Sequence, residues 1–217
     1  MREHWATALG GAAGIGSRFN LYQGDYFQWQ FTYANGAYRY VNHTQGGAFS
    51  PTQFNGDNLG YGFVSDGVFS VATGDVHLTT VWGINAAYDH LWLPNFRTSV
   101  YVAWNRTEYD GAANLAICNA QTIAAAGAIM FTPVQIARGN CNNDFSWWQL
   151  GSRTQYNFTP WFYVGFDVIY QKLETASNGA SVTYTALANT AKPTAIYRIQ
   201  DQDNYGLRIR VHRDIVP

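Results

Sequence analysis

The chain has 217 residues, of which only 12% are charged and 17% are aromatic, and its formal net charge at pH 7 is −1. Soluble domains carry about 25% charged residues, so the composition argues against an ordinary soluble domain, and the missing basic excess argues against a nucleic-acid partner. The mean hydropathy is −0.21, and no run of about 18 apolar residues occurs, which excludes a transmembrane helix.

The first segment, residues 3–19, is rich in Gly and Ala and predicts a strand. It follows no apolar signal-peptide stretch or cleavage site, so we expect either a removed signal or a fragment of a longer chain. Its Gly10–Gly16 stretch matches the G-x-x-x-G-x-G spacing of nucleotide-binding dehydrogenases, which need a buried strand before it and a helix after it. Neither the strand nor the helix is present, and a Tyr-x-x-x-Lys pair is also missing. We therefore interpret the glycines as small residues of a crowded barrel wall. A nucleotide-binding enzyme is kept as an alternative.

Long stretches of alternating residues follow, and alternation with a period of two predicts strands with one apolar and one polar face. In the clearest of them Trp82 and Ile84 share one face, while Asn85 and Asp89 share the other. The faces with Trp29, Trp82, Trp104, Val164 and Leu207 should all point outward. The predicted strands are 26–41, 76–90, 96–109, both arms of a hairpin over 145–172, and 203–213.

Each arm of the 145–172 hairpin has about a dozen residues, whereas strands of soluble domains usually have about 5–6. A tilted strand needs roughly 9–11 residues to cross a bilayer. Aromatic residues gather near the ends of the arms, where a membrane-interface girdle would lie, and a turn is predicted over Asn157–Pro160. One face of a soluble β-sandwich is the alternative.

The connections alternate between short turns and three long loops, predicted over residues 42–74, 110–144 and 175–201. This alternation is typical of outer-membrane barrels, with short periplasmic turns and long extracellular loops. A bacterial single-chain barrel needs an even number of at least about 8 strands. With about seven strands, we expect an open sheet with unpaired edges near residues 3–18 and 203–213.

Several segments resemble the general porins of alphaproteobacteria: Gly24–Gln28, Ala34–Ala37, Gly60–Asp66, Leu78–His90, Gly151–Asn157 and Val211–Asp214. The resemblance implies a sixteen-stranded, water-filled, usually trimeric barrel in the lipid of the outer membrane, through which small hydrophilic solutes diffuse. Residues 1–217 would be part of this barrel domain, from the C-terminal half or so. The family's signal peptide, early strands and acidic constriction loop have no counterpart here, and the chain ends without the usual aromatic-rich signal.

Charged residues on the polar parity of the strands are the candidate pore-lining residues, since charge in a pore sets ion preference. They are Arg97, Arg153, Asp167, Arg208, Arg210 and Asp89. Alternatively, they are ordinary wall residues paired inside a wet lumen. The five histidines lack metal-ligand spacing and no Ser/His/Asp arrangement is evident, so we expect no metal, no cofactor and no enzymatic activity. A structural or adhesive β-sheet protein, or a non-functional porin fragment, are the other functional alternatives.

The only two cysteines, Cys118 and Cys141, fall in one predicted extracellular loop. Proteins that mature through the periplasm meet an oxidising environment, so an even cysteine count there predicts a disulfide. Two free thiols or a metal site are the competing interpretations, but two cysteines without a neighbouring histidine make a poor zinc site.

Overall fold

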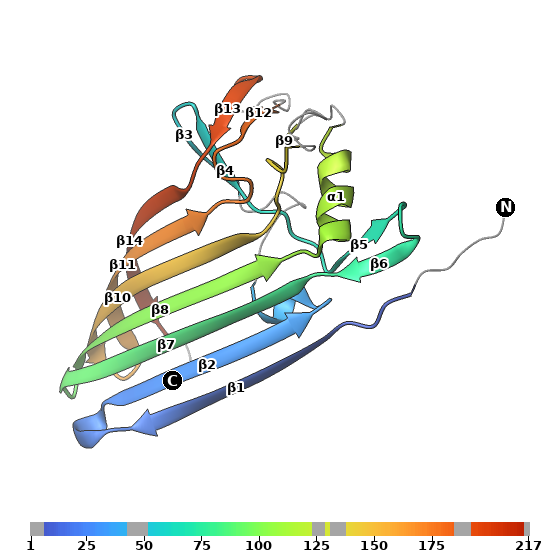
Figure 1. Cartoon of the computed structure of the whole chain (residues 1–217). Coiled ribbons are helices and arrows are strands. Elements are labelled where there is room, and N and C mark those ends of the chain that lie inside the picture. The colour runs from blue at the N-terminus through green and yellow to red at the C-terminus, as the bar shows by residue number, and fades with distance from the viewer. Residues whose placement is uncertain (1–6, 43–51, 123–128, 131–137, 185–191, 215–217) are drawn as a thin grey trace.

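A computed structural model of the protein describes residues 7–42, 52–122, 129–130, 138–184 and 192–214. Seven long strands form one curved antiparallel sheet, in the order β1-β2-β7-β8-β10-β11-β14 (Figure 1). The expected all-β, antiparallel fold is therefore confirmed. The strands are Gly11–Asn20 (β1), Tyr26–Asn35 (β2), Thr80–Leu93 (β7), Phe96–Glu108 (β8), Phe145–Thr159 (β10), Phe162–Glu174 (β11) and Gln202–Arg213 (β14).

The register of the sheet fixes its two faces, because residues directly opposite each other in an antiparallel pair point to the same side. Trp104 lies opposite Ile84 on β7 and Trp148 on β10. Followed from strand to strand, the pairing puts all the predicted outward residues on one side, called the outer face: Trp29, Trp82, Trp104, Val164 and Leu207. Asn85 falls on the opposite side, the inner face, so the predicted register is confirmed.

Short turns close one end of the sheet. Asp25, in the turn before β2, accepts hydrogen bonds from the Tyr88 hydroxyl (2.6 Å), His90 Nδ1 (2.7 Å) and the backbone N–H of Leu91 (2.8 Å). The bond from Tyr88, followed by those from Leu91 and His90, lowers the pKa of Asp25 to about 2. This carboxylate therefore ties the first short turn to β7.

Several predicted boundaries were wrong. The strand expected over 76–90 is interrupted at Thr79, whose N–H donates to Asp66 O instead of to a strand partner. The strand expected over 26–41 ends at Asn35, because the chain then turns through Gly36, which has a positive φ of 68°. The turn expected at Asn157–Pro160 is centred later, because Thr159 still pairs with Phe162.

The long connections at the other end are not the plain loops that were expected. They form a five-stranded sheet in the order β3-β4-β13-β12-β9, a two-stranded β5-β6 hairpin and one helix, together called the cap (Figure 1). Its elements are β3 (Thr52–Asn55), β4 (Asn58–Tyr61), β5 (Gly67–Ser70), β6 (Asp75–Leu78), α1 (Gly111–Ala120), β9 (Ile129–Met130), β12 (Ser181–Tyr184) and β13 (Ala195–Ile199). Two short 3-10 helices lie outside the cap: η1 (Tyr22–Gly24) in the turn between β1 and β2, and η2 (Tyr38–Tyr40) after β2.

The main buried core lies where the cap meets the inner face of the sheet. Tyr61 of β4 is fully buried and its N–H donates to Thr175 Oγ1 at 2.8 Å. The Phe145 ring lies so close to Gly62 that a Cβ there would stand 2.7 Å from it. Val81 and Leu173 complete the contact from β7 and β11. The cap therefore covers the inner face at this end of the strands.

β1 and β14 are the two edges of the described sheet, as expected for an open sheet. Both strands run from the cap end toward the short-turn end, because six successive antiparallel pairings separate them. Closing the sheet with antiparallel pairs alone therefore requires an odd number of further strands, since direct pairing of β1 with β14 would be parallel.

Candidate functional site

The outer face is apolar in its middle and charged only near the strand ends. Large apolar side chains such as Val102 (40% exposed) and Leu150 (50% exposed) remain accessible there. Burying such side chains is worth about 1.5–3 kcal/mol each. Because the described part of the chain offers them no cover, this face is suited to lipid. Its charged residues all lie near one end or the other of their strands: His90, Arg106, Glu108, Lys172, Glu174, Asp203 and Arg213.

Aromatic rings border this apolar belt at both ends. At the cap end Trp82, Trp104 and Trp148 lie side by side, with ring centroids 4.6 and 5.9 Å apart. At the short-turn end Tyr156 packs on Phe158, with centroids 4.9 Å apart. Trp148 and Phe158 are ten residues apart on β10, about 33 Å along the strand or about 25 Å along the normal at a tilt of about 40°. This matches the apolar band of about 25 Å of a transmembrane barrel.

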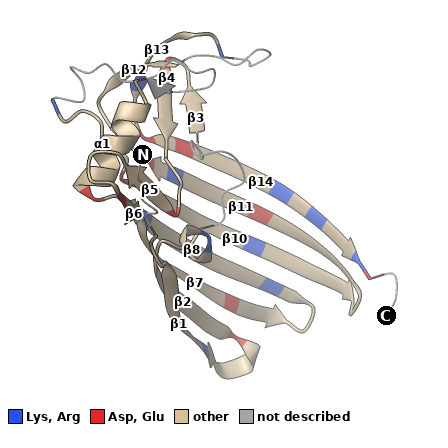
Figure 2. Ribbon diagram, turned by 90° about the vertical axis from the view of Figure 1, so that its right-hand side faces the viewer, with Lys and Arg blue, Asp and Glu red and all other residues tan. Residues whose placement is uncertain are grey.

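The inner face carries charged residues in the middle of the strands, where the outer face has none: Asp89, Arg153, Asp167 and Arg208. One cross-strand row connects four of the predicted pore-lining residues with Ser99 between them: Asp89, Ser99, Arg153, Asp167 and Arg208. Arg97 and Arg210 occupy the row two residues nearer the short turns. The structure therefore brings all six predicted residues together on one face, and Figure 2 shows the charged bands along these strands.

Two of the arginines are paired. Arg153 donates from Nε to Asp167 Oδ1 at 2.5 Å and from Nη2 to Asp167 Oδ2 at 2.9 Å, a bidentate pair. Arg97 Nε lies 3.6 Å from Asp89 Oδ1, while Ser99 donates to Asp89 Oδ2 at 2.7 Å. Both aspartates are almost fully buried, and a buried carboxylate requires such a partner. These pairs fit the alternative of neutralised wall residues.

Arg208 and Arg210 on β14 have a different environment. Arg208 lies opposite Asp167, both of whose carboxylate oxygens already accept from Arg153. Arg210 lies opposite Gly165, which has no side chain to meet it. Within the described residues neither arginine forms an ion pair.

A fifth inner-face arginine was missed. Arg18 on β1 lies opposite Gln28, and its guanidinium stands 4.0 Å from the centroid of the Tyr26 ring. The period-two pattern could have found it, but the Gly/Ala-rich segment around it has too little contrast to show which parity is apolar. Tyr101, whose parity places it on the same face, also lines the inner wall, and its ring lies over Gly151, where a Cβ would be only 2.3 Å away.

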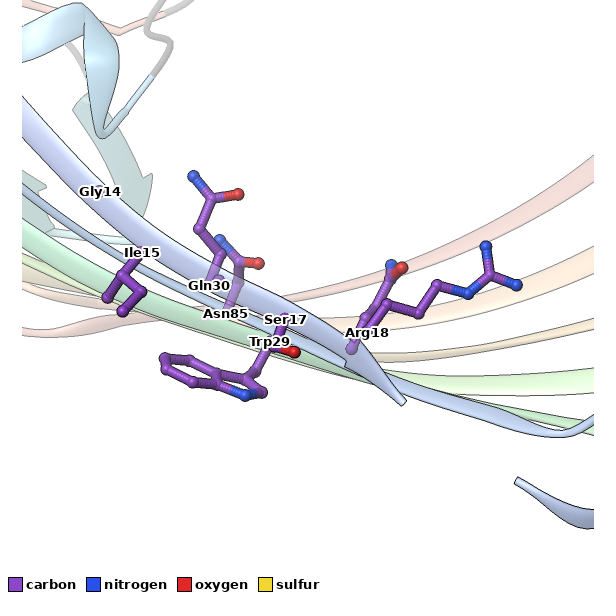
Figure 3. Close-up of a pocket in the computed structure, with 9 residues that line it drawn as sticks. Gly14, Ile15, Ser17, Arg18, Trp29, Gln30 and Asn85 are labelled. Carbon is purple, nitrogen blue, oxygen red and sulfur yellow. The ribbon is translucent and has the colours of Figure 1, made fainter. Parts of the chain in front are cut away.

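The glycine motif of the N-terminal segment belongs to this wall and not to a nucleotide-binding turn. Gly14 and Gly16 lie inside β1, and a Cβ on Gly16 would stand 2.7 Å from the Trp29 carbonyl oxygen. A hollow of about 520 Å³ surrounds them. Figure 3 shows Trp29 on one side of the strand and Gln30 on the other, so the hollow spans both faces at the sheet edge.

In the cap, the structure reveals a hydrogen-bonded chain that the sequence did not suggest. Thr73 Oγ1 lies 2.8 Å from His77 Nε2, and His77 Nδ1 lies 2.7 Å from Asp110 Oδ2. The other oxygen of Asp110 accepts from the Ala113 N–H at 2.8 Å and so caps α1. The chain of bonds therefore braces the β5-β6 hairpin against the N-terminus of the helix.

The two cysteines are joined by a disulfide between Cys118 and Cys141, with Cα atoms 6.0 Å apart. Cys118 is a buried residue of α1, so the bond attaches the helix to the segment that leads into β10. Residues 110–144 were predicted to be a plain loop, and this prediction was wrong for the first part of the segment. Asp110 supplies an N-cap, and the next ten residues form a helix.

Among the residues that the structure describes, no group of three or more His, Cys, Asp or Glu side chains could hold a metal ion. Within the same residues, no helix has the length and apolar character needed to span a bilayer.

An antiparallel sheet with an apolar outer face between aromatic girdles and a charged inner face defines the wall of a transmembrane β-barrel. The family model described as "porin subfamily" matches residues 3–207, and the chain belongs to this family. Comparisons with curated proteins and with solved structures found no significant match.

Proposed function

We propose that the protein is an outer-membrane porin whose barrel passes small hydrophilic solutes and ions by passive diffusion. The observation that carries this proposal is the separation of charge between the two faces. The inner face carries Asp89, Arg153 and Asp167 in the middle of the strands, where the outer face has none. Lipid-facing charge in the middle of a barrel is destabilising, whereas charge in a water-filled lumen is tolerated.

The strand directions support a role as one part of a larger barrel domain. The two edges run the same way, so an odd number of additional antiparallel strands is needed. A sixteen-stranded barrel of the alphaproteobacterial type would need nine, which satisfies this condition. Assembly as a homotrimer belongs to the same proposal and rests on the resemblance to that family.

Proteoliposomes test the function. Protein isolated from outer membranes, with the strands that complete its barrel, should admit small sugars and exclude large polysaccharides. Heat-modifiable gel mobility verifies that the barrel is folded. Folded, membrane-inserted protein that passes no solute would contradict the porin function and favour a structural role.

A further inference from the structure

The five arginines of the inner face divide into two kinds, with different electrostatic consequences. Arg97 and Arg153 each face an aspartate, so each pair is close to neutral. Arg18, Arg208 and Arg210 have no carboxylate partner among the described residues. Five arginines against two aspartates leave the described inner face with an excess of three positive charges.

Two of these unpaired charges lie on one strand. Arg208 and Arg210 are two residues apart on β14, about 7 Å along the strand. Asp167, the nearest cross-strand carboxylate, is occupied by Arg153, and Gly165 has no side chain to pair with Arg210. An anion that passes this part of β14 would meet two guanidinium groups, which present fork-shaped donors suited to carboxylate and phosphate oxygens.

We propose that Arg208 and Arg210 make this wall prefer anions, so that small carboxylates, phosphate and chloride pass more readily than cations of similar size. This inference rests on the porin function proposed above and assigns its solute class. The paired arginines contribute little to the preference, because their charge is neutralised by Asp89 and Asp167. The free charges raise the local concentration of counter-ions along the lumen.

Planar-bilayer recordings in a KCl gradient test the proposal, with the reversal potential converted into the permeability ratio of chloride to potassium. The unchanged protein should give a ratio above one. The double variant Arg208→Gln with Arg210→Gln should lower this ratio by about twofold or more while the channel still conducts. Raising the salt to 1 M should bring the ratio toward one, since the Debye length falls to about 3 Å.

Two further variants serve as controls. Arg106→Gln with Lys172→Gln removes the same number of positive charges from the cap end of the outer face, and should leave the ratio unchanged. Arg208→Lys with Arg210→Lys keeps the charge and should retain the preference. A ratio at or below one in the unchanged protein, or no response to the β14 glutamines, would overturn the proposal and leave the porin function standing. Folded protein without conductance would instead contradict the porin function itself.

Discussion

In the seven-stranded sheet, apolar side chains such as Leu150 stay 50% exposed, whereas in the cap Leu59, Tyr61 and Ile199 are completely buried. The two regions have similar apolar residues, but the described chain covers only those of the cap and of the inner face beneath it. The outer face of the sheet is therefore suited to lipid, whereas the cap and the inner face beneath it share a buried core. Substitutions that distinguish the two regions should act on one and spare the other.

The largest expected effect is the loss of membrane assembly when charge enters the outer face. Val168 lies opposite Ser152, near the middle of the apolar belt, and Val168→Arg should destabilise the inserted barrel by about 2–4 kcal/mol, the usual cost of Arg near the bilayer midplane. Gln149 of β10 points instead to the inner face, where it bonds with Gln171. Gln149→Arg is therefore the matched control, and should assemble normally.

Urea titration of the barrel in lipid, followed by heat-modifiable mobility, measures this difference. If both arginine variants were equally destabilised, the assignment of the outer face to lipid would be wrong.

The next effect concerns the cap alone. Replacing Cys118 and Cys141 with Ser opens a covalent loop with a sequence separation of 23, which costs about 3 kcal/mol in the chain-entropy model. We expect faster proteolysis within the cap and no change in the urea midpoint of the sheet. Mass spectrometry without reductant shows whether the bond forms: free thiols at both positions in protein from outer membranes would refute it.

A smaller effect is expected at the N-terminus of α1. Burial acts to raise the pKa of Asp110, but hydrogen bonds from the Ala113 N–H and His77 outweigh it, so the pKa is lowered below 3.8. A lowered pKa means that the stabilisation is complete above the ordinary carboxyl range and is lost as the pH falls through the lowered value.

Asp110→Ala should therefore destabilise the cap by about 1 kcal/mol at neutral pH, the usual cost of losing an N-cap. Asp110→Asn keeps an N-cap oxygen and should keep most of this stability, but lose the acid-dependent step. Proteolysis of the cap between pH 7 and pH 3 measures both. If the cap of Asp110→Asn still lost stability as the pH fell, the pH dependence would belong to another group.

The sheet was more predictable from the sequence than the cap, for a physical reason. A strand with lipid on one side and water on the other alternates with period two, so the faces of Trp82, Asn85 and Arg153 could be assigned without the structure. The cap strands are only two to five residues long and pair across great distances in the chain, as β4 does with β13. Such short segments carry no readable period, so their core and the Thr73–His77–Asp110 bonds were missed.

The same limit applies within the inner face. Parity placed Arg97, Arg153, Arg208 and Arg210 on one side, but could not separate paired from unpaired arginines, because that depends on the register between strands. Once Asp167 is opposite both Arg153 and Arg208, its bidentate bond to Arg153 decides which arginine remains free.

Thiol accessibility along β10 tests the central claim most directly, namely that one face of the sheet meets lipid and the other meets water. The two native cysteines are joined to each other, so single cysteines can be introduced at Gln149, Leu150, Gln155 and Tyr156 without a competing thiol. In the membrane-inserted protein, a small water-soluble maleimide should label positions 149 and 155 and spare positions 150 and 156. Equal labelling at positions 149 and 150, or labelling confined to positions 150 and 156, would contradict the account.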